Sequence, residues 1–125
     1  RMGRILRTQE ARAWALVTTN YERGRAFEYR VRDDMRSRGY WAQRSPRSGT
    51  SVDVFACHAG TVFFIQAKRD GRISRIEISE LRYLAGKHRA MPIFARPEKI
   101  KGKRRSGLVY KLLTDGSPFV PPKVK

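Results

Sequence analysis

The sequence predicts a single α/β domain in which a central mixed β-sheet is flanked by helices. Two apolar runs, residues 51–56 and 61–68, flank turn-forming residues and predict the two strands of a β-hairpin. Phe27, Val31 and Met35 recur every four residues and predict the buried stripe of a helix. The chain has 125 residues and 40% hydrophobic content, and no linker or repeat divides it, so one modest core is expected.

Helices are expected both before and after the hairpin along the chain. A helix over residues 8–17 precedes a capping-box signature, Thr19 and Glu22, which is expected to open a second helix. The second helix carries the apolar stripe and is expected to end at Gly39. After the hairpin, Ser79 offers an N-cap for a third helix.

Further strands complete the predicted sheet. Residues 40–44 form a first strand, residues 92–95 follow the third helix, and residues 107–114 return as an edge strand. The strand over residues 61–68 is apolar on both of its faces, which favours a central place in the sheet. The tail, residues 115–125, contains three prolines and is expected to be irregular.

The hairpin register places three polar side chains together. Antiparallel partners keep a constant sum of residue numbers, so a turn centred between Ala59 and Gly60 sets Asp53 opposite Gln66. Opposed residues have Cβ atoms about 4.5–5.5 Å apart, close enough for two side-chain oxygens to reach one cation. Lys68 is two residues beyond Gln66 and points to the same face.

This polar group predicts a site for a divalent metal ion. A buried acid in a strand needs a partner, and Asp53 stands among apolar residues. An amide oxygen can bind magnesium but carries no negative charge, so Gln66 predicts a weaker site than a glutamate would give. The alternative is structural: Asp53 and Lys68 would form a buried ion pair, with Gln66 as a hydrogen-bonding neighbour.

An acid followed by a polar-x-Lys motif on the next strand resembles the core of the PD-(D/E)XK nuclease superfamily. From Gly24 to about Ala95 the chain resembles the archaeal-type Holliday junction resolvases. The matching positions are Gly24, Glu28, Gly39, Tyr40, Arg44, Ser45, Ser48, Asp53 and Lys68. Gln66 departs from this pattern, because most resolvases have glutamate there. The string Ile65-Gln66-Ala67-Lys68-Arg69 is instead similar to the motif of Mrr-type restriction endonucleases.

The resemblance implies a restriction-endonuclease-like fold and Mg²⁺-dependent hydrolysis of a phosphodiester, with Mn²⁺ as an alternative cofactor. It implies that Asp53, Gln66 and the main-chain carbonyl of Ala67 bind the metal, and that Lys68 orients water or stabilises developing charge. Glu28 completes the implied catalytic set and would restore some of the charge that Gln66 lacks. Whether one metal ion or two bind is left open.

The charge of the chain indicates nucleic acid as its partner. Lys and Arg number 28 against 11 Asp and Glu, which gives a formal net charge of +17. The loop before the hairpin carries hydroxyls and arginines suited to a phosphate, although an ordinary surface turn explains its composition equally well. The residues expected to contact DNA are Arg44, Arg47, Ser48, Arg69, Lys103, Arg104 and Arg105.

Other classes of function find little support in the sequence. Cys57 is the one cysteine, and with His58 and His88 it does not make a zinc site; Cys57 and His58 are expected in the turn. Two histidines also leave little scope for covalent catalysis. No run of about 18 apolar residues and no signal or lipidation motif occurs, so an intracellular protein without a membrane partner is expected.

Together these features predict one nuclease domain over residues 1–125, with a helical extension over about 5–20, a core over about 21–114 and the irregular tail. The resemblance implies a homodimer, since a two-fold protein suits a two-fold junction. The first expectation is a metal-dependent resolvase of four-way or branched DNA. Two alternatives are an Mrr-like endonuclease that cuts duplex DNA and a basic DNA-binding protein without catalysis.

Overall fold

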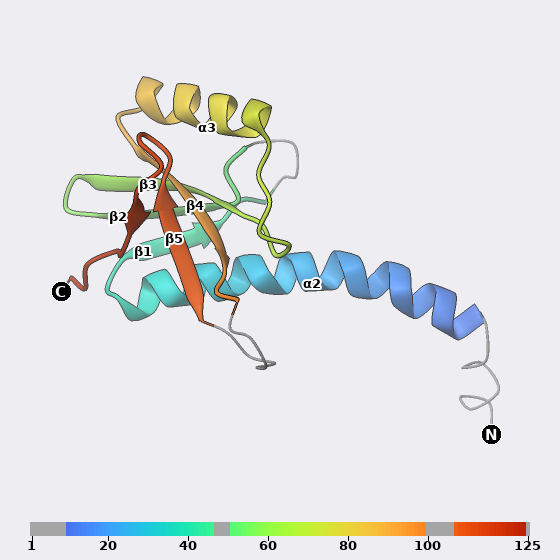
Figure 1. The fold of residues 1–125 in the computed structure, drawn as a ribbon. Helices are drawn as coiled ribbons and strands as arrows, with labels where there is room; N and C mark the ends of the chain where they lie inside the picture. The colour runs from blue at the N-terminus through green and yellow to red at the C-terminus, as the bar shows by residue number, and fades with distance from the viewer. Residues whose placement is uncertain (1–9, 47–50, 100–106, 125) are drawn as a thin grey trace.

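The computed structural model describes residues 10–46, 51–99 and 107–124, with side chains from Tyr21 onward. Within these residues six strands form one mixed sheet in the order of the chain, and two helices cover its faces (Figure 1). The helices are α2 (Glu10–Ser37) and α3 (Arg75–Lys87). The strands are β1 (Trp41–Arg44), β2 (Val54–His58), β3 (Thr61–Ala67), β4 (Met91–Pro97), β5 (Leu108–Leu112) and β6 (Pro118–Phe119). The predicted α/β fold with a central mixed sheet is confirmed.

The sheet is antiparallel except where β3 and β4 run parallel. A parallel pair needs a crossover, and α3 supplies it between β3 and β4. Because the crossover starts where β3 ends, the first turn of α3 follows closely after the polar end of that strand. This connection positions the candidate site.

The β2–β3 hairpin has the predicted register. Val54 pairs with Ile65 and His58 pairs with Thr61, so the two-residue turn falls at Ala59 and Gly60. Both turn residues have positive φ, 47° and 89°, as a type I′ hairpin turn requires. The shorter turn means that Cys57 and His58 belong to β2, and their expected place in the turn is wrong. β3 lies between β2 and β4, which confirms its central place.

Two apolar clusters hold the helices on the sheet. Phe27, Val31 and Met35 of α2 are buried against β1, β2 and β3, as the four-residue repeat predicted. On the other face, Leu81 of α3 packs with Phe94 of β4 in a smaller cluster. The helices therefore lie on opposite faces of the sheet, with α3 above it and α2 below it in Figure 1.

Two predicted helix boundaries are wrong. α2 runs unbroken through Thr19, so the Thr19–Glu22 signature does not open a helix. No proline interrupts this stretch, and a threonine inside a helix costs less than about 1 kcal/mol relative to alanine. The N-cap of α3 is Ser74, whereas Ser79 lies within the helix. Ser74 and Glu77 form a complete capping box, which ends the loop five residues earlier than expected.

The tail is ordered against the end of α2 rather than irregular throughout. Pro118 and Phe119 form β6 on the side of β5, so β5 is not the edge strand. Beyond β6 the chain returns to α2, where Arg38 Nη1 donates to the Pro121 carbonyl (2.7 Å). The Val124 N–H donates to the Arg38 carbonyl (2.7 Å).

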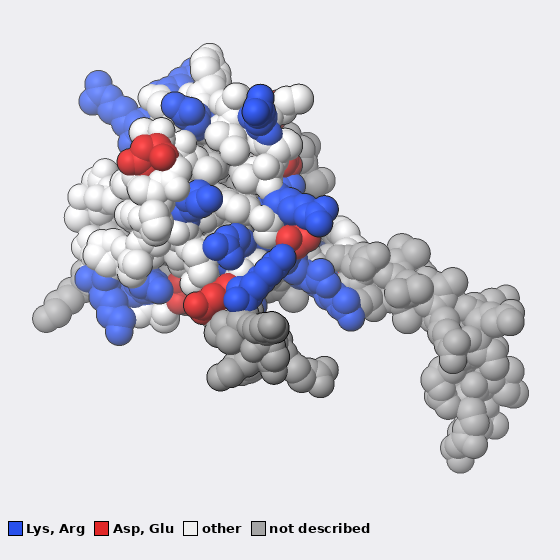
Figure 2. Space-filling model, in the orientation of Figure 1, with Lys and Arg blue, Asp and Glu red and all other residues white. Residues whose placement is uncertain are grey.

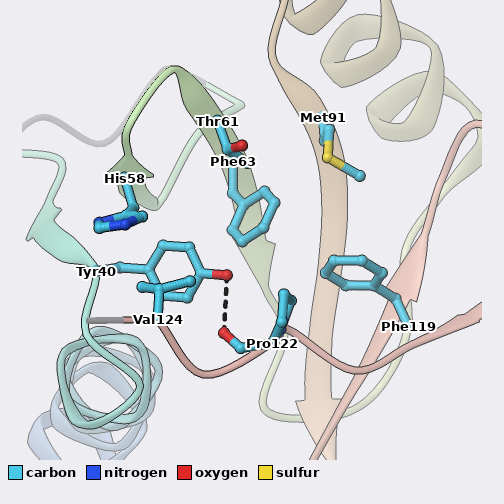
Figure 3. Close-up of a pocket in the computed structure, with 8 residues that line it drawn as sticks. All are labelled: Tyr40, His58, Thr61, Phe63, Met91, Phe119, Pro122 and Val124. Atoms are coloured by element: carbon cyan, nitrogen blue, oxygen red, sulfur yellow. Dashed lines mark hydrogen bonds between the residues drawn. The ribbon is translucent and has the colours of Figure 1, made fainter.

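An apolar hollow lies between this tail and the sheet. Figure 3 shows Tyr40, Phe63 and Phe119 around it, with the Tyr40 hydroxyl donating to the Pro122 carbonyl at 2.9 Å. The Phe63 ring lies 5.2 Å from the Tyr40 ring and 5.5 Å from the Phe119 ring, measured between centroids. These contacts extend the core to the last described residues of the chain.

We predict that Gly39→Ala destabilises the protein by about 1–3 kcal/mol. Gly39 has φ of +101°, and a Cβ there would lie 2.0 Å from the Val124 carbonyl oxygen, so the tail would have to move. Gly24→Ala is the matched control, because a Cβ there meets nothing within 4 Å and alanine favours a helix interior by about 0.5–1 kcal/mol. Urea denaturation of both variants checks this, and equal midpoints would contradict it.

Candidate active site

The candidate site lies at the end of the hairpin remote from its turn, where Asp53 precedes β2. Main-chain bonds fix this residue: its N–H donates to the Ile65 carbonyl (2.8 Å), and its own carbonyl accepts from the Ser45 N–H (2.8 Å). Its carboxylate oxygen Oδ2 accepts from the Ala67 N–H (2.8 Å). The carboxylate is therefore held against the main chain between Gln66 and Lys68.

Gln66 is a buried polar residue of β3, with 5% of its surface exposed. Its Nε2 donates to Glu77 Oε2 at 3.4 Å, and its Oε1 is buried without a hydrogen-bond partner among the described residues. An unpaired buried acceptor is uncommon, because it has given up its hydration and received nothing in return. Such an oxygen in a cluster of charged groups is suited to a cation.

Lys68 follows the last residue of β3 and forms an ion pair with α3. Its Nζ lies 2.6 Å from Glu77 Oε2, and both side chains are less than a third exposed. Glu77 also accepts the Ser74 N–H with its other oxygen, Oε1, at 2.9 Å. The Lys68 ammonium, donating to Glu77, is the main cause that holds the pKa of this carboxyl below its ordinary value.

The pKa of Asp53 rises to about 6, chiefly because the carboxyl is buried. The Ala67 N–H and the Lys68 charge oppose this rise, whereas the negative charges of Glu28 and Glu77 add to it. Four charged side chains therefore act on one another at this end of the sheet. A carboxyl whose pKa is raised toward neutral pH by burial and by like charges is typical of a functional site.

Glu28 comes from α2 and forms an ion pair with β1. Its Oε1 lies 2.7 Å from Arg44 Nε, and the Arg44 guanidinium also lies 5.2 Å from the Tyr29 ring centroid. Glu28 is near enough to raise the pKa of Asp53, although its own carboxylate is paired with Arg44. The catalytic role of Glu28 and the DNA contact of Arg44 stay predictions, and the two side chains bind each other in this structure.

The other residues expected to contact DNA are only partly described. Arg69 is exposed beside Lys68, and Arg72 and Arg75 are exposed around the start of α3. Figure 2 shows Lys and Arg side chains spread over the viewed face, with small patches of Asp and Glu between them. Arg47, Ser48, Lys103, Arg104 and Arg105 lie outside the described residues.

The oxygen donors at the site fit a magnesium-type ion. Asp53 offers a carboxylate, Gln66 an amide oxygen and Ala67 a main-chain carbonyl, and all three are hard ligands. Among residues 10–46, 51–99 and 107–124, no group of three or more His, Cys, Asp or Glu could hold a metal by itself. Mg²⁺ commonly binds through one or two carboxylates together with water and substrate phosphate. The buried Gln66 Oε1 is the observation that favours this fit.

Glu77 is the site residue that the sequence analysis missed. The metal-site prediction considered only the hairpin and α2, because the family pattern places the acids there. The signal was present as Ser74-x-x-Glu77, a capping box that fixes the start of α3 and hence the place of the glutamate.

Comparisons with known proteins identify the family and the fold of the chain. The family model of the Mrr catalytic domain, described as restriction endonuclease, matches residues 19–94. Among solved structures, Hjc from Archaeoglobus fulgidus, described as a Holliday junction resolvase from an archaeal hyperthermophile, matches with a TM-score of 0.61 and 20% sequence identity, covering 74% of each chain. None of the curated proteins compared with the chain matches it.

The structural match shows that the fold is restriction-endonuclease-like. The family match includes the whole candidate site. It runs from α2 through Asp53, Gln66 and Lys68 to α3 and the start of β4. The resemblance predicted from the sequence motifs is therefore confirmed. The match also covers more than half of the chain, and the chain belongs to the restriction endonuclease family defined by the Mrr catalytic domain.

Proposed function

We propose that this protein is a Mg²⁺-dependent DNA endonuclease that prefers four-way or other branched DNA. Membership of a restriction endonuclease family supports DNA cleavage. The likeness of the fold to a Holliday junction resolvase supports the branched substrate. The observation that carries the proposal is the bond from the Ala67 N–H to the Asp53 carboxylate, which gathers Asp53, Gln66 and Lys68 at one point.

The residues of the site would have two separate roles, metal binding and stabilisation of charge. Asp53, the Gln66 Oε1 and the Ala67 carbonyl would hold the cation, which when bound polarises the phosphate and lowers the pKa of water. Lys68 is fixed by its 2.6 Å contact with Glu77, so its ammonium keeps one orientation at the end of β3. A fixed positive charge can stabilise the charge that develops on phosphate without further reorganisation.

The high positive charge supports DNA as the substrate. A net charge of +17 on 125 residues attracts a phosphate backbone, and binding releases the counterions of the DNA. We propose Mn²⁺ as an alternative cofactor and a homodimer as the active form, because paired sites would cut a two-fold junction symmetrically. Neither described helix has the length and apolar content to cross a membrane.

Cleavage of duplex DNA is the second candidate. The matching family is described as restriction endonuclease, and Gln66 stands at the position where the sequence motif is Mrr-like. A synthetic four-way junction and a linear duplex of the same sequence, each incubated with the protein in Mg²⁺, separate the two. We expect the junction to be cut much faster. Equal rates favour the duplex enzyme, and two intact substrates favour a binding protein without catalysis.

Asp53→Asn and Lys68→Ala are predicted to reduce cleavage at least about 100-fold while binding to the junction persists. Asp53 supplies the one carboxylate of the proposed metal ligands, and Lys68 supplies the fixed positive charge. Single-turnover cleavage and gel-shift titration measure the two effects separately. Lys87→Ala is the matched control, since Lys87 is exposed at the other end of α3. Full activity in either site variant would exclude this assignment.

Asp53→Asn is also predicted to stabilise the protein above pH 6. Because the folded-state pKa of Asp53 is about 6, compared with 3.8 as its ordinary value, ionisation of the carboxyl opposes folding. Two pKa units correspond to about 2–3 kcal/mol at pH 8, a difference that shrinks as pH falls through 6 and vanishes near 4. Urea denaturation at these pH values without metal measures it, with the exposed Asp33→Asn as control. A pH-independent difference would contradict the prediction.

A further inference from the structure

We infer that Glu77 is a positioning residue of this site, and that it supplies from α3 the second negative charge that the strand lacks at Gln66. The inference rests on the proposed function, because it concerns how the same site binds its metal ion and holds Lys68. It rests on three contacts of one carboxylate, on the balance of charge around Asp53, and on the orientation of the Gln66 amide.

Glu77 joins both polar residues of β3 to the start of α3. Its Oε2 accepts from Lys68 Nζ at 2.6 Å and from Gln66 Nε2 at 3.4 Å. Its Oε1 accepts from the Ser74 N–H at 2.9 Å, and the Ser74 hydroxyl accepts from the Glu77 N–H at 3.1 Å. The capping box thus fixes one end of the carboxylate, and the other end is directed at the site.

The balance of charge shows why this carboxylate matters. Glu28 and Arg44 form one ion pair with no net charge, although the Glu28 carboxylate still acts on Asp53. Asp53 and Lys68 carry one negative and one positive charge, and Gln66 carries none. With Glu77 the group has an excess of one negative charge, whereas without it the group would be neutral. A divalent cation binds more strongly to the negative set.

The contact with Gln66 also sets the direction of its amide. Nε2 faces the carboxylate of Glu77, where a hydrogen-bond donor is favoured and an oxygen would be repelled. The Oε1 must then point the other way, and there it is buried without a partner among the described residues. Glu77 therefore holds the amide oxygen available as a ligand.

Glu77→Gln tests the role of the charge while keeping the cap, because glutamine also serves at this position of a capping box. We expect Mn²⁺ affinity, measured without DNA by isothermal titration, to fall about 10-fold or more, as for other groups that orient metal ligands. Glu80→Gln is the matched control: Glu80 is exposed on the same helix. Unchanged affinity in Glu77→Gln would overturn the inference.

Moving the charge back to the strand provides the rescue. The double variant Gln66→Glu with Glu77→Gln is expected to bind Mn²⁺ within about threefold of the wild type, since the site regains its second carboxylate. Ser74→Ala breaks the cap but keeps the charge, and it is expected to lower the urea midpoint with little loss of affinity. If Ser74→Ala loses as much affinity as Glu77→Gln, Glu77 serves only as part of the cap.

Measurements on the wild-type protein separate the proposed function from the role of Glu77. A wild-type protein that neither binds Mn²⁺ nor cuts DNA would overturn the proposed function and the role of Glu77 with it. A wild-type protein that does both, with Glu77→Gln equal to it in affinity and cleavage, would overturn the role of Glu77 alone.

Discussion

The 2.8 Å hydrogen bond from the Ala67 N–H to the Asp53 carboxylate is the contact on which the site depends. It joins the start of β2 to the end of β3 beyond the last pair of the hairpin ladder, Val54 and Ile65. A carboxylate in this position is largely buried, and burial raises its pKa. The hydrogen bond from the Ala67 N–H lowers the pKa again, but only in part. The fold therefore holds an acid that binding of a cation would stabilise.

Helix α3 adds the second half of the arrangement. Because β3 and β4 are parallel, the chain must cross one face of the sheet between them, and it starts that crossing just after Lys68. The capping box then places Glu77 within 2.6 Å of the Lys68 ammonium. The crossover that the parallel strands require thus brings the Glu77 side chain, which lies outside the hairpin, to the site.

The sequence predicts the parts of this structure that local patterns determine. The hairpin register follows from its turn, and the central place of β3 follows from apolar residues on both of its faces. The end of α2 at Ser37, two residues before Gly39, likewise agrees with a glycine at positive φ. From the register alone, Asp53, Gln66 and Lys68 could be expected near one another.

Features that depend on competition between signals could not be predicted in the same way. Thr19 and Ser79 have the right residue types for caps, but a continuous helix in one case and the stronger Ser74 box in the other prevail. β6 and the packing of the tail arise from contacts with Arg38 and Tyr40, some 80 residues earlier in the chain. The pairing of Glu28 with Arg44 and of Glu77 with Lys68 joins different elements. The Ser74 capping box marks where α3 begins, but no local pattern indicates which strand residue Glu77 meets.

The anchored tail has a practical consequence for handling the protein. Val124 is bonded to Arg38 next to Gly39, on the side where β1 begins and the hairpin turns, whereas Asp53 and Ala67 lie where the hairpin strands begin and end. A fluorophore or surface linker attached to the exposed Lys123 would lie away from the polar end of the sheet. Immobilisation through that side chain should keep the candidate site open to large substrates.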